Sequence, residues 1–399
     1  MIRLTSLLLA ALAAAAQDNQ EILSKLSEIT GLAVLRPVVQ HNMKRSELKS
    51  YFEARIAEAV KPEEIRLEEL ALKKLGFVPA DFDLKKTTVE LMSEQAAAFY
   101  DYRKKKMVML EETGSGMMQD LALVHELGHA LADQHFNLEK FLRKSGADDD
   151  SSLARMAVME GQATWLMSEY MAKRMGQSLL ESPSMVDMMT RMAGAGGSGF
   201  PVFQSVPLYM RETLVFPYAQ GMAFQQKLAE KLGKQAFTEI FKRPPQSTQE
   251  ILHADKYFAH VAHAKPALPQ LANEKQWKAL VEGITGELDH QILIKQYAHS
   301  YELAAEQWTG GVYRLWENKK DRRVVLAYAS SWSSEKAATD FMGIYKRVLK
   351  GKWKQVEFSD ESENRLAGKS EDGFFVTLRN GSTVTSLEGL PSAGGAKGM

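Results

Sequence analysis

The chain has 399 residues, 50 basic and 50 acidic side chains, and no cysteine. A chain of this length can bury a large core, and we expect one large domain plus a small one. The net charge of zero gives no sign of a broadly basic surface, so no nucleic-acid partner is expected. The lack of cysteine excludes disulfides, thiolate ligands and a cysteine nucleophile. Any bound metal ion must therefore be held by His, Asp or Glu, which favours a catalytic over a structural site.

The first 16 residues have the pattern of a secretory signal peptide. Arg3 supplies the positive charge, Leu4–Leu12 the apolar core, and the alanines up to Ala16 a cleavage site before Gln17. The apolar run is shorter than the roughly 20 residues that span a bilayer, which favours cleavage over a retained anchor. We expect an exported protein, periplasmic or secreted, with no stable membrane span after cleavage.

The chain then alternates predicted helices with short loops, as apolar periodicity and capping residues indicate. Gly76 follows the third helix at a typical stop position. The predicted helices are Glu21–Thr30, Ser46–Val60, Pro62–Leu75 and Thr87–Ala97, and Arg36–His41 is a candidate strand.

Phe99–Leu110 is predicted to form a hairpin or an edge strand. One interpretation is an edge strand to which an extended peptide substrate could add. An ordinary edge strand protected by Lys104, Lys105 and Lys106 fits the same pattern. The two interpretations are compatible, so this segment does not decide between functions.

The next predicted helix, Gln119–His135, carries His125-Glu126-Leu127-Gly128-His129, an H-E-x-x-H motif. Residues four apart share a helix face, so both imidazoles can reach one metal ion. Zinc lowers the pKa of a bound water towards ~7, and the Glu126 carboxylate is placed to take its proton. The uncharged flanks indicate a buried helix, as in a metalloprotease. The alternative is a core helix with two hydrogen-bonded histidines.

A second long helix is predicted at Ser152–Met175, with Glu160 among apolar neighbours. A buried carboxylate needs a partner, because an unpaired buried charge is costly. Zinc is one candidate, which makes Glu160 the candidate third metal ligand. An arginine, Arg155 or Arg211, is the other candidate partner. The glycine and alanine beside Glu160 are expected to let this helix approach the metal helix closely.

His135 competes for the role of third ligand. It has the spacing of the metzincin motif H-E-x-x-H-x-x-G-x-x-H, but Ala132 stands where that motif has glycine. Glycine lets the chain leave the helix sharply, so with alanine the helix should continue and His135 should point away from the metal. Glu160 is therefore favoured, as in gluzincins. Asp133, one turn after His129, either orients an imidazole or faces solvent.

Two residues are candidates for stabilising the oxyanion formed at zinc. Tyr218 lies in a predicted helical region, Val206–Leu232, and His253 follows a predicted helix N-terminus at Ser247. Each side chain can donate a hydrogen bond to a negative oxygen. Lone aromatic and histidine residues are also commonly structural, and that alternative stays open for both.

The composition changes near Gln307, after one or two helices predicted between Gln276 and Ala304. A strand–strand–helix–strand–strand order follows, which indicates a small α+β module over residues 307–390. The Gly- and Ser-rich tail, residues 391–399, is predicted to be disordered. The predicted strands and helix are Gly311–Trp316, Arg323–Tyr328, Ser334–Leu349, Leu366–Ser370, Gly373–Leu378 and Ser382–Ser386.

These motifs together resemble the gluzincin-like zinc peptidases of the zincin superfamily, in particular an exported or membrane-associated bacterial group. The resemblance implies zinc held by His125, His129 and Glu160, with Glu126 as general base and acid. Thermolysin-like enzymes have an aspartate one turn after the ligand glutamate, where this chain has Thr164. The resemblance is carried by Phe99-Tyr100-Asp101, His125 to Leu131, Asp133-Gln134, Glu160-Gly161-Gln162-Ala163-Thr164, Phe216-Pro217-Tyr218 with Gly221, and Ser247 to His253.

The sequence thus predicts an α+β protein, with a predominantly helical zincin-like domain over residues 17–300, a small edge-stranded sheet within it, and a small C-terminal α+β module. The predicted function is an exported zinc-dependent endopeptidase that acts on peptide or protein substrates. The rival is a non-catalytic exported zinc-binding scaffold that keeps the zincin fold. An aminopeptidase would need an acidic anchor for the substrate amine, and none is identified. Substrate preference and oligomeric state are left open.

Overall fold

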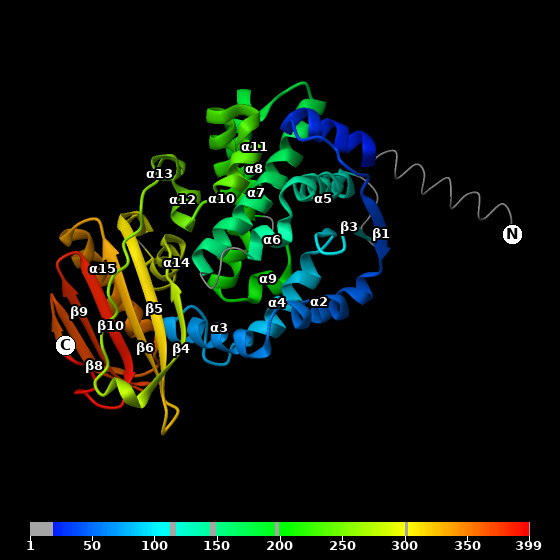
Figure 1. The fold of residues 1–399 in the computed structure, drawn as a ribbon. Coiled ribbons are helices and arrows are strands. Elements are labelled where there is room, and N and C mark those ends of the chain that lie inside the picture. The colour runs from blue at the N-terminus through cyan, green and yellow to red at the C-terminus, as the bar shows by residue number, and fades with distance from the viewer. Residues whose placement is uncertain (1–18, 112–116, 144–148, 196–198, 300–301, 399) are drawn as a thin grey trace.

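The computed structural model describes residues 19–111, 117–143, 149–195, 199–299 and 302–398. The predicted signal peptide lies outside the described residues. The fold is α+β, as predicted, with a body of helices beside a large antiparallel sheet (Figure 1). Among the described helices, none is both long and apolar enough to cross a membrane.

The helices that the sequence predicts before the large sheet agree closely with those in the structure. Residues 19–30 are helical. α3 begins with Pro62 in its first turn and ends at Gly76, which adopts the left-handed conformation (φ 88°) that favours glycine. The helices are α2 (Arg45–Ala59), α3 (Pro62–Leu75), α4 (Leu84–Gln95), α5 (Met117–Phe136), α6 (Leu138–Arg143), α7 (Asp149–Arg174), α8 (Pro183–Ala195), α9 (Pro201–Ser205), α10 (Leu208–Leu232), α11 (Ala236–Lys242), α12 (Thr248–Leu252) and α13 (Ala254–Ala259).

A small sheet lies beside α5, and the predicted hairpin forms part of it. β2 (Ala98–Asp101) and β3 (Lys106–Leu110) pair antiparallel. β1 (Val39–Met43) pairs parallel with β3, which gives the order β1-β3-β2. β2 is therefore an edge strand within this sheet.

The large sheet has seven antiparallel strands in the order β4-β5-β6-β10-β9-β8-β7. α15 (Glu335–Lys352) packs on one face, and its N-cap, Ser334, accepts a hydrogen bond from the Ala337 amide. α14 (Glu287–Tyr297) precedes β5. The strands are β4 (Trp277–Ile284), β5 (Trp308–Asn318), β6 (Val324–Trp332), β7 (Val356–Ser362), β8 (Arg365–Ser370), β9 (Gly373–Asn380) and β10 (Thr383–Leu390).

Two expectations for this part of the chain were wrong. The segment from Gln276 was expected to be helical, but it forms β4, so the sheet begins well before residue 307. The tail was expected to be disordered, but residues up to 398 lie along the segment before β4. The Ala272 amide donates to the Gly395 carbonyl, the Lys397 amide donates to the Gln270 carbonyl, and Ala396 packs on the outer face of the sheet.

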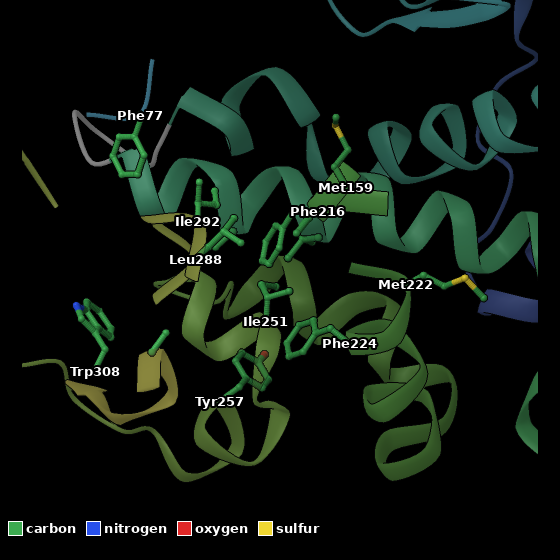
Figure 2. Close-up of a cluster of buried hydrophobic side chains, with 14 of the residues drawn as sticks. Phe77, Met159, Phe216, Met222, Phe224, Ile251, Tyr257, Leu288, Ile292 and Trp308 are labelled. Carbon is green, nitrogen blue, oxygen red and sulfur yellow. The ribbon is translucent and has the colours of Figure 1, made fainter. Parts of the chain in front are cut away.

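The main hydrophobic core is continuous between the helical body and the sheet. Phe216 and Ile251 belong to the helices, whereas Trp308 belongs to β5, and all lie in one cluster of buried side chains. Figure 2 shows Leu288 and Ile292 of α14 filling the space between them. The two parts of the molecule therefore share one core.

Candidate metal centre

The H-E-x-x-H motif lies in α5, within the helix that the sequence predicts. His125 and His129 project from one face because they are four residues apart. Val124, Leu127 and Ala130 are buried on other faces, which fixes the helix against its neighbours.

α7 places the Glu160 carboxylate opposite the two imidazoles. Oε2 of Glu160 lies 3.1 Å from Nε2 of His125 and 3.2 Å from Nε2 of His129. The two Nε2 atoms are 3.0 Å apart. The ligand atoms of these three residues are close enough together to bind one metal ion. We call His125, His129 and Glu160 the three-residue cluster.

The atoms of the three-residue cluster fit a zinc ion as the shared partner. In a tetrahedral zinc site with bonds of about 2.0–2.1 Å, ligand atoms lie roughly 3.3 Å apart, close to the spacing here. Two imidazole nitrogens and a carboxylate oxygen all offer lone pairs to the space between them. Three such atoms repel one another unless protons or a cation lie between them. The donor set is the N and O set that zinc accepts.

Electrostatics at the three-residue cluster favour the ionised carboxylate. Burial alone would raise the pKa of Glu160, but the charge and hydrogen bonds of His129 and His125 outweigh it and hold that pKa far below its usual range. Burial would lower the pKa of His129, and Glu160 reverses that shift so that the pKa is raised. The ionised Glu160 carboxylate is therefore stabilised by the charge and hydrogen bonds of the two histidines.

Glu126 is adjacent in sequence to His125 of the three-residue cluster, and its carboxylate is bonded to a backbone amide. Its Oε2 accepts a hydrogen bond of 2.6 Å from the Tyr100 amide in β2. Its carboxylate also contributes to the raised pKa of His129. α5 and the edge strand β2 thus meet at the Glu126 carboxylate, the predicted general base.

Tyr218 is brought to the three-residue cluster from α10. Its ring stacks on His125, with ring centroids 6.0 Å apart. The negative charge of Glu160, burial, and the charge of Glu126 raise the pKa of Tyr218 well above its usual value. The phenol therefore stays protonated, with its O–H within hydrogen-bonding reach of the Glu160 carboxylate.

His253 is not brought to the three-residue cluster, and the expected oxyanion role receives no support. Its Nε2 lies 2.8 Å from Oε1 of Glu287, which is buried at the start of α14. Gln249 donates to the other Glu287 oxygen at 2.7 Å. The hydrogen bond with Glu287 raises the pKa of His253. This group connects the helical body to the sheet region.

Other proposed partners also lie elsewhere. Among the described residues, no ion pair joins Glu160 to Arg155 or Arg211. Nη1 of Arg155 donates to the Phe141 carbonyl at 3.3 Å instead. Nε2 of His135 bonds the Ala33 carbonyl at 2.8 Å, so His135 does not compete as a metal ligand.

Asp133 was a candidate to orient an imidazole, and the structure gives it different partners. Oδ2 of Asp133 accepts from the Tyr100 hydroxyl at 2.9 Å, and Oδ1 accepts from Nζ of Lys105 at 2.8 Å. The carboxylate is buried, so the solvent-facing alternative is wrong as well.

The small residues beside Glu160 serve two neighbours rather than one. Ala163 meets the metal helix, where a Cβ on Gly128 would lie 3.5 Å from the Ala163 Cα. Gly161 instead touches Gly221 of α10, the helix that carries Tyr218. The three helices that supply the centre are therefore packed through residues that have little or no side chain.

Sequence reasoning missed the role of Tyr100. It belongs to the Phe-Tyr-Asp stretch that carries part of the family resemblance, but its contacts with Glu126 and Asp133 join residues far apart in sequence. Every residue except proline has a backbone amide, so residue type does not reveal which amide bonds Glu126. The only indication was that the predicted strand precedes the H-E-x-x-H helix.

Comparison with protein families matches a part of the chain outside this centre. A family described as a domain of unknown function (DUF8575) matches residues 257–399, which is less than half of the chain. The matched region contains the whole seven-stranded sheet with α14 and α15. No curated protein and no solved structure matches the chain. The gluzincin resemblance therefore stays a prediction from the sequence motifs.

Proposed function

We propose that this protein is an exported zinc-dependent endopeptidase of the gluzincin type. The observation that carries the proposal is the convergence of the three-residue cluster on one point, with Glu126 and Tyr218 beside it. The helices that supply these side chains are α5, α7 and α10, and they come from separate parts of the chain. A structural histidine pair would not require a base and a protonated phenol at the same point.

The donor set supports zinc as the ion that His125, His129 and Glu160 would hold. Zinc held there would act as a Lewis acid towards the substrate carbonyl and would make a water acidic enough to attack near neutral pH. Glu126 takes the proton of the attacking water and then delivers it to the leaving amine. Before substrate binds, the hydrogen bond from the Tyr100 amide orients the Glu126 carboxylate.

Tyr218 donates its hydroxyl proton in a hydrogen bond to the oxygen that gains negative charge during attack. A donor that is already in place costs no reorganisation when the charge develops, which is why such groups are effective. The raised pKa of Tyr218 keeps this donor protonated at neutral pH.

The edge strand supports an extended peptide as the substrate. β2 pairs with β3 on one side, and the Tyr100 amide points away from β3 towards Glu126. Backbone direction alternates along a strand, so the Ala98 amide and carbonyl face the same free edge. A peptide can add to this edge as a strand, with its scissile bond near the three-residue cluster. A site that holds peptide backbone on an open edge suits internal cleavage.

The test is hydrolysis of a mixed peptide library by the mature zinc-loaded protein, with Glu126→Gln as a matched control. We expect cleavage by the wild type, loss with a chelator, recovery with zinc, and no turnover by Glu126→Gln at unchanged zinc content. Near-normal turnover by Glu126→Gln would overturn the mechanism. One bound zinc without any cleavage would instead favour the rival, a non-catalytic zinc-binding scaffold.

A further inference from the structure

The edge strand β2 is tied to the metal helix at two points. Glu126 and Asp133 are seven residues apart on α5, which is about two turns, so they lie on the same helix face. Both hold Tyr100: Glu126 accepts from its backbone amide at 2.6 Å and Asp133 accepts from its hydroxyl at 2.9 Å. One residue of the strand thus spans the distance between the two carboxylates.

Asp133 is the centre of a buried polar group. Besides Tyr100, it accepts from Nζ of Lys105 at 2.8 Å and from the Leu138 amide at 2.9 Å, and Nη2 of Arg36 lies 3.7 Å away. Its side chain is 0% exposed. A buried carboxylate with this many donors is held in one position, and it holds its partners in turn.

Lys105 shows that the hairpin turn is shaped by this contact. Its φ of 55° is in the left-handed region, which residues other than glycine, asparagine and aspartate adopt rarely. Its ammonium group reaches Asp133 from that position. The ion pair therefore links the turn between β2 and β3 to α5.

The two residues after Asp133 hold the opposite side of the small sheet. Gln134 accepts from the amides of Leu35 and Arg36 and donates to the Arg36 carbonyl. His135 bonds the Ala33 carbonyl. This segment leads into β1, the other outer strand. The three consecutive residues at the end of the metal helix therefore hold the sheet from both sides.

We propose that Asp133 is a positioning residue for substrate binding, which sets the register of the edge strand β2 against the metal helix through Tyr100 and Lys105. This inference rests on the proposed function, because it assigns β2 to the peptide substrate. Asp133 acts through the strand and not on the metal ligands. Its loss should weaken binding of extended peptides while zinc binding stays intact.

The experiment uses the full-length mature protein, zinc-loaded, with three variants. Tyr100→Phe removes only the hydroxyl bonded to Asp133. Lys105→Asn removes the ammonium group but tolerates the left-handed turn. Lys104→Asn is the matched control, because Lys104 neighbours Lys105 and its amine lies over the Tyr51 ring instead of at Asp133. We measure zinc content, KM and kcat on a cleaved peptide, and amide hydrogen exchange over residues 98–101.

We expect Tyr100→Phe and Lys105→Asn to raise KM about tenfold, the size of one lost charge-assisted hydrogen bond, with a smaller effect on kcat. Exchange over residues 98–101 should accelerate in both variants and not in Lys104→Asn, and zinc content should stay at one. KM and exchange rates equal to those of Lys104→Asn, or loss of zinc from either variant, would overturn the proposal. If the wild type cleaves no peptide, the endopeptidase proposal fails, and the inference about substrate binding fails with it. Unchanged amide exchange in both variants would separately show that Asp133 does not hold β2 in place.

Discussion

Gly161 of α7 and Gly221 of α10 are in direct contact, because a Cβ built on Gly161 would lie 2.1 Å from the Gly221 carbonyl carbon. Glu160 directly precedes Gly161, and Tyr218 lies one turn before Gly221. The spacing of these two helices therefore fixes the distance between the candidate third ligand and the candidate oxyanion donor.

Replacing Gly161 by alanine should move α7 away from α10. We expect Gly161→Ala to lower the free energy of unfolding by about 1–3 kcal/mol, as overpacking in a dense core does. Zinc affinity should fall roughly tenfold or more, because the Glu160 carboxylate shifts with the helix. Chemical unfolding with and without zinc measures both effects.

The control is Gly343→Ala in α15, where an added Cβ meets nothing within 4 Å. That change should be neutral or stabilising by up to about 1 kcal/mol, and similar results for both variants would contradict the prediction.

Tyr218 and His253 were equal candidates for the oxyanion, and the structure separates them. Tyr218→Phe should lower kcat by roughly 10²–10³-fold at unchanged zinc content, the usual effect of removing one oxyanion donor. His253→Gln should leave kcat close to that of the wild type, because His253 bonds Glu287 and not the three-residue cluster. Steady-state kinetics on one peptide decides this, and the reverse order of effects would refute the assignment.

His290 should make stability depend on pH. It is buried between the Gly286 carbonyl and the Tyr328 hydroxyl, and burial lowers its pKa to about 4. The unfolded chain has an ordinary histidine with a pKa of about 6.5, so it takes up the proton first as the pH falls. The free energy of unfolding should therefore decrease between about pH 6.5 and 4, by up to about 3 kcal/mol, and should be insensitive to His290 above that range.

The measurement is urea unfolding at several pH values in the presence of a chelator, for the wild type and His290→Gln. The variant has lower stability at neutral pH but should lose this part of the acid dependence. An equally steep dependence in both proteins would show that His290 does not cause it.

The C-terminal tail should contribute to stability. Residues 391–398 form two backbone hydrogen bonds with the segment before β4, and Ala396 covers part of the outer face of the sheet. Truncation after Leu390 should therefore reduce the free energy of unfolding by about 2 kcal/mol, roughly 1 kcal/mol for each lost hydrogen bond. Removal of Met399 alone is the control. Equal thermal unfolding of both truncated forms would restore the expectation of a disordered tail.

The parts of the centre that sequence predicted are those that local rules determine. Helical spacing alone places His125 and His129 on one face, and the cost of a buried charge points to a partner for Glu160. The partners of His253 and Asp133 were missed because they depend on packing between distant segments. Glu287 is 34 residues from His253 in sequence, and Tyr100 is 33 from Asp133. Residue type at one position does not encode such a pairing.

The same limit explains the errors in the fold. Strands are recognised by alternation, and β4 has a register irregularity between Ala279 and Val281 that breaks it. The tail has the composition of a disordered segment, but backbone hydrogen bonds to residues 270–272 hold it in place. β5 was located correctly from Gly311–Trp316, the part of the strand in which buried and less buried side chains alternate regularly.

Because the core is continuous, metal binding at the three-residue cluster would also affect the stability of the whole molecule. A ligand that binds only the folded state stabilises every part that unfolds together with its site. Side chains of the helical body and the sheet lie in one cluster, so zinc bound at the three-residue cluster would stabilise the distant strands as well. If the proposed zinc site is occupied, the supply of zinc would then set how long the whole molecule resists proteolysis, since proteases cut chains that open.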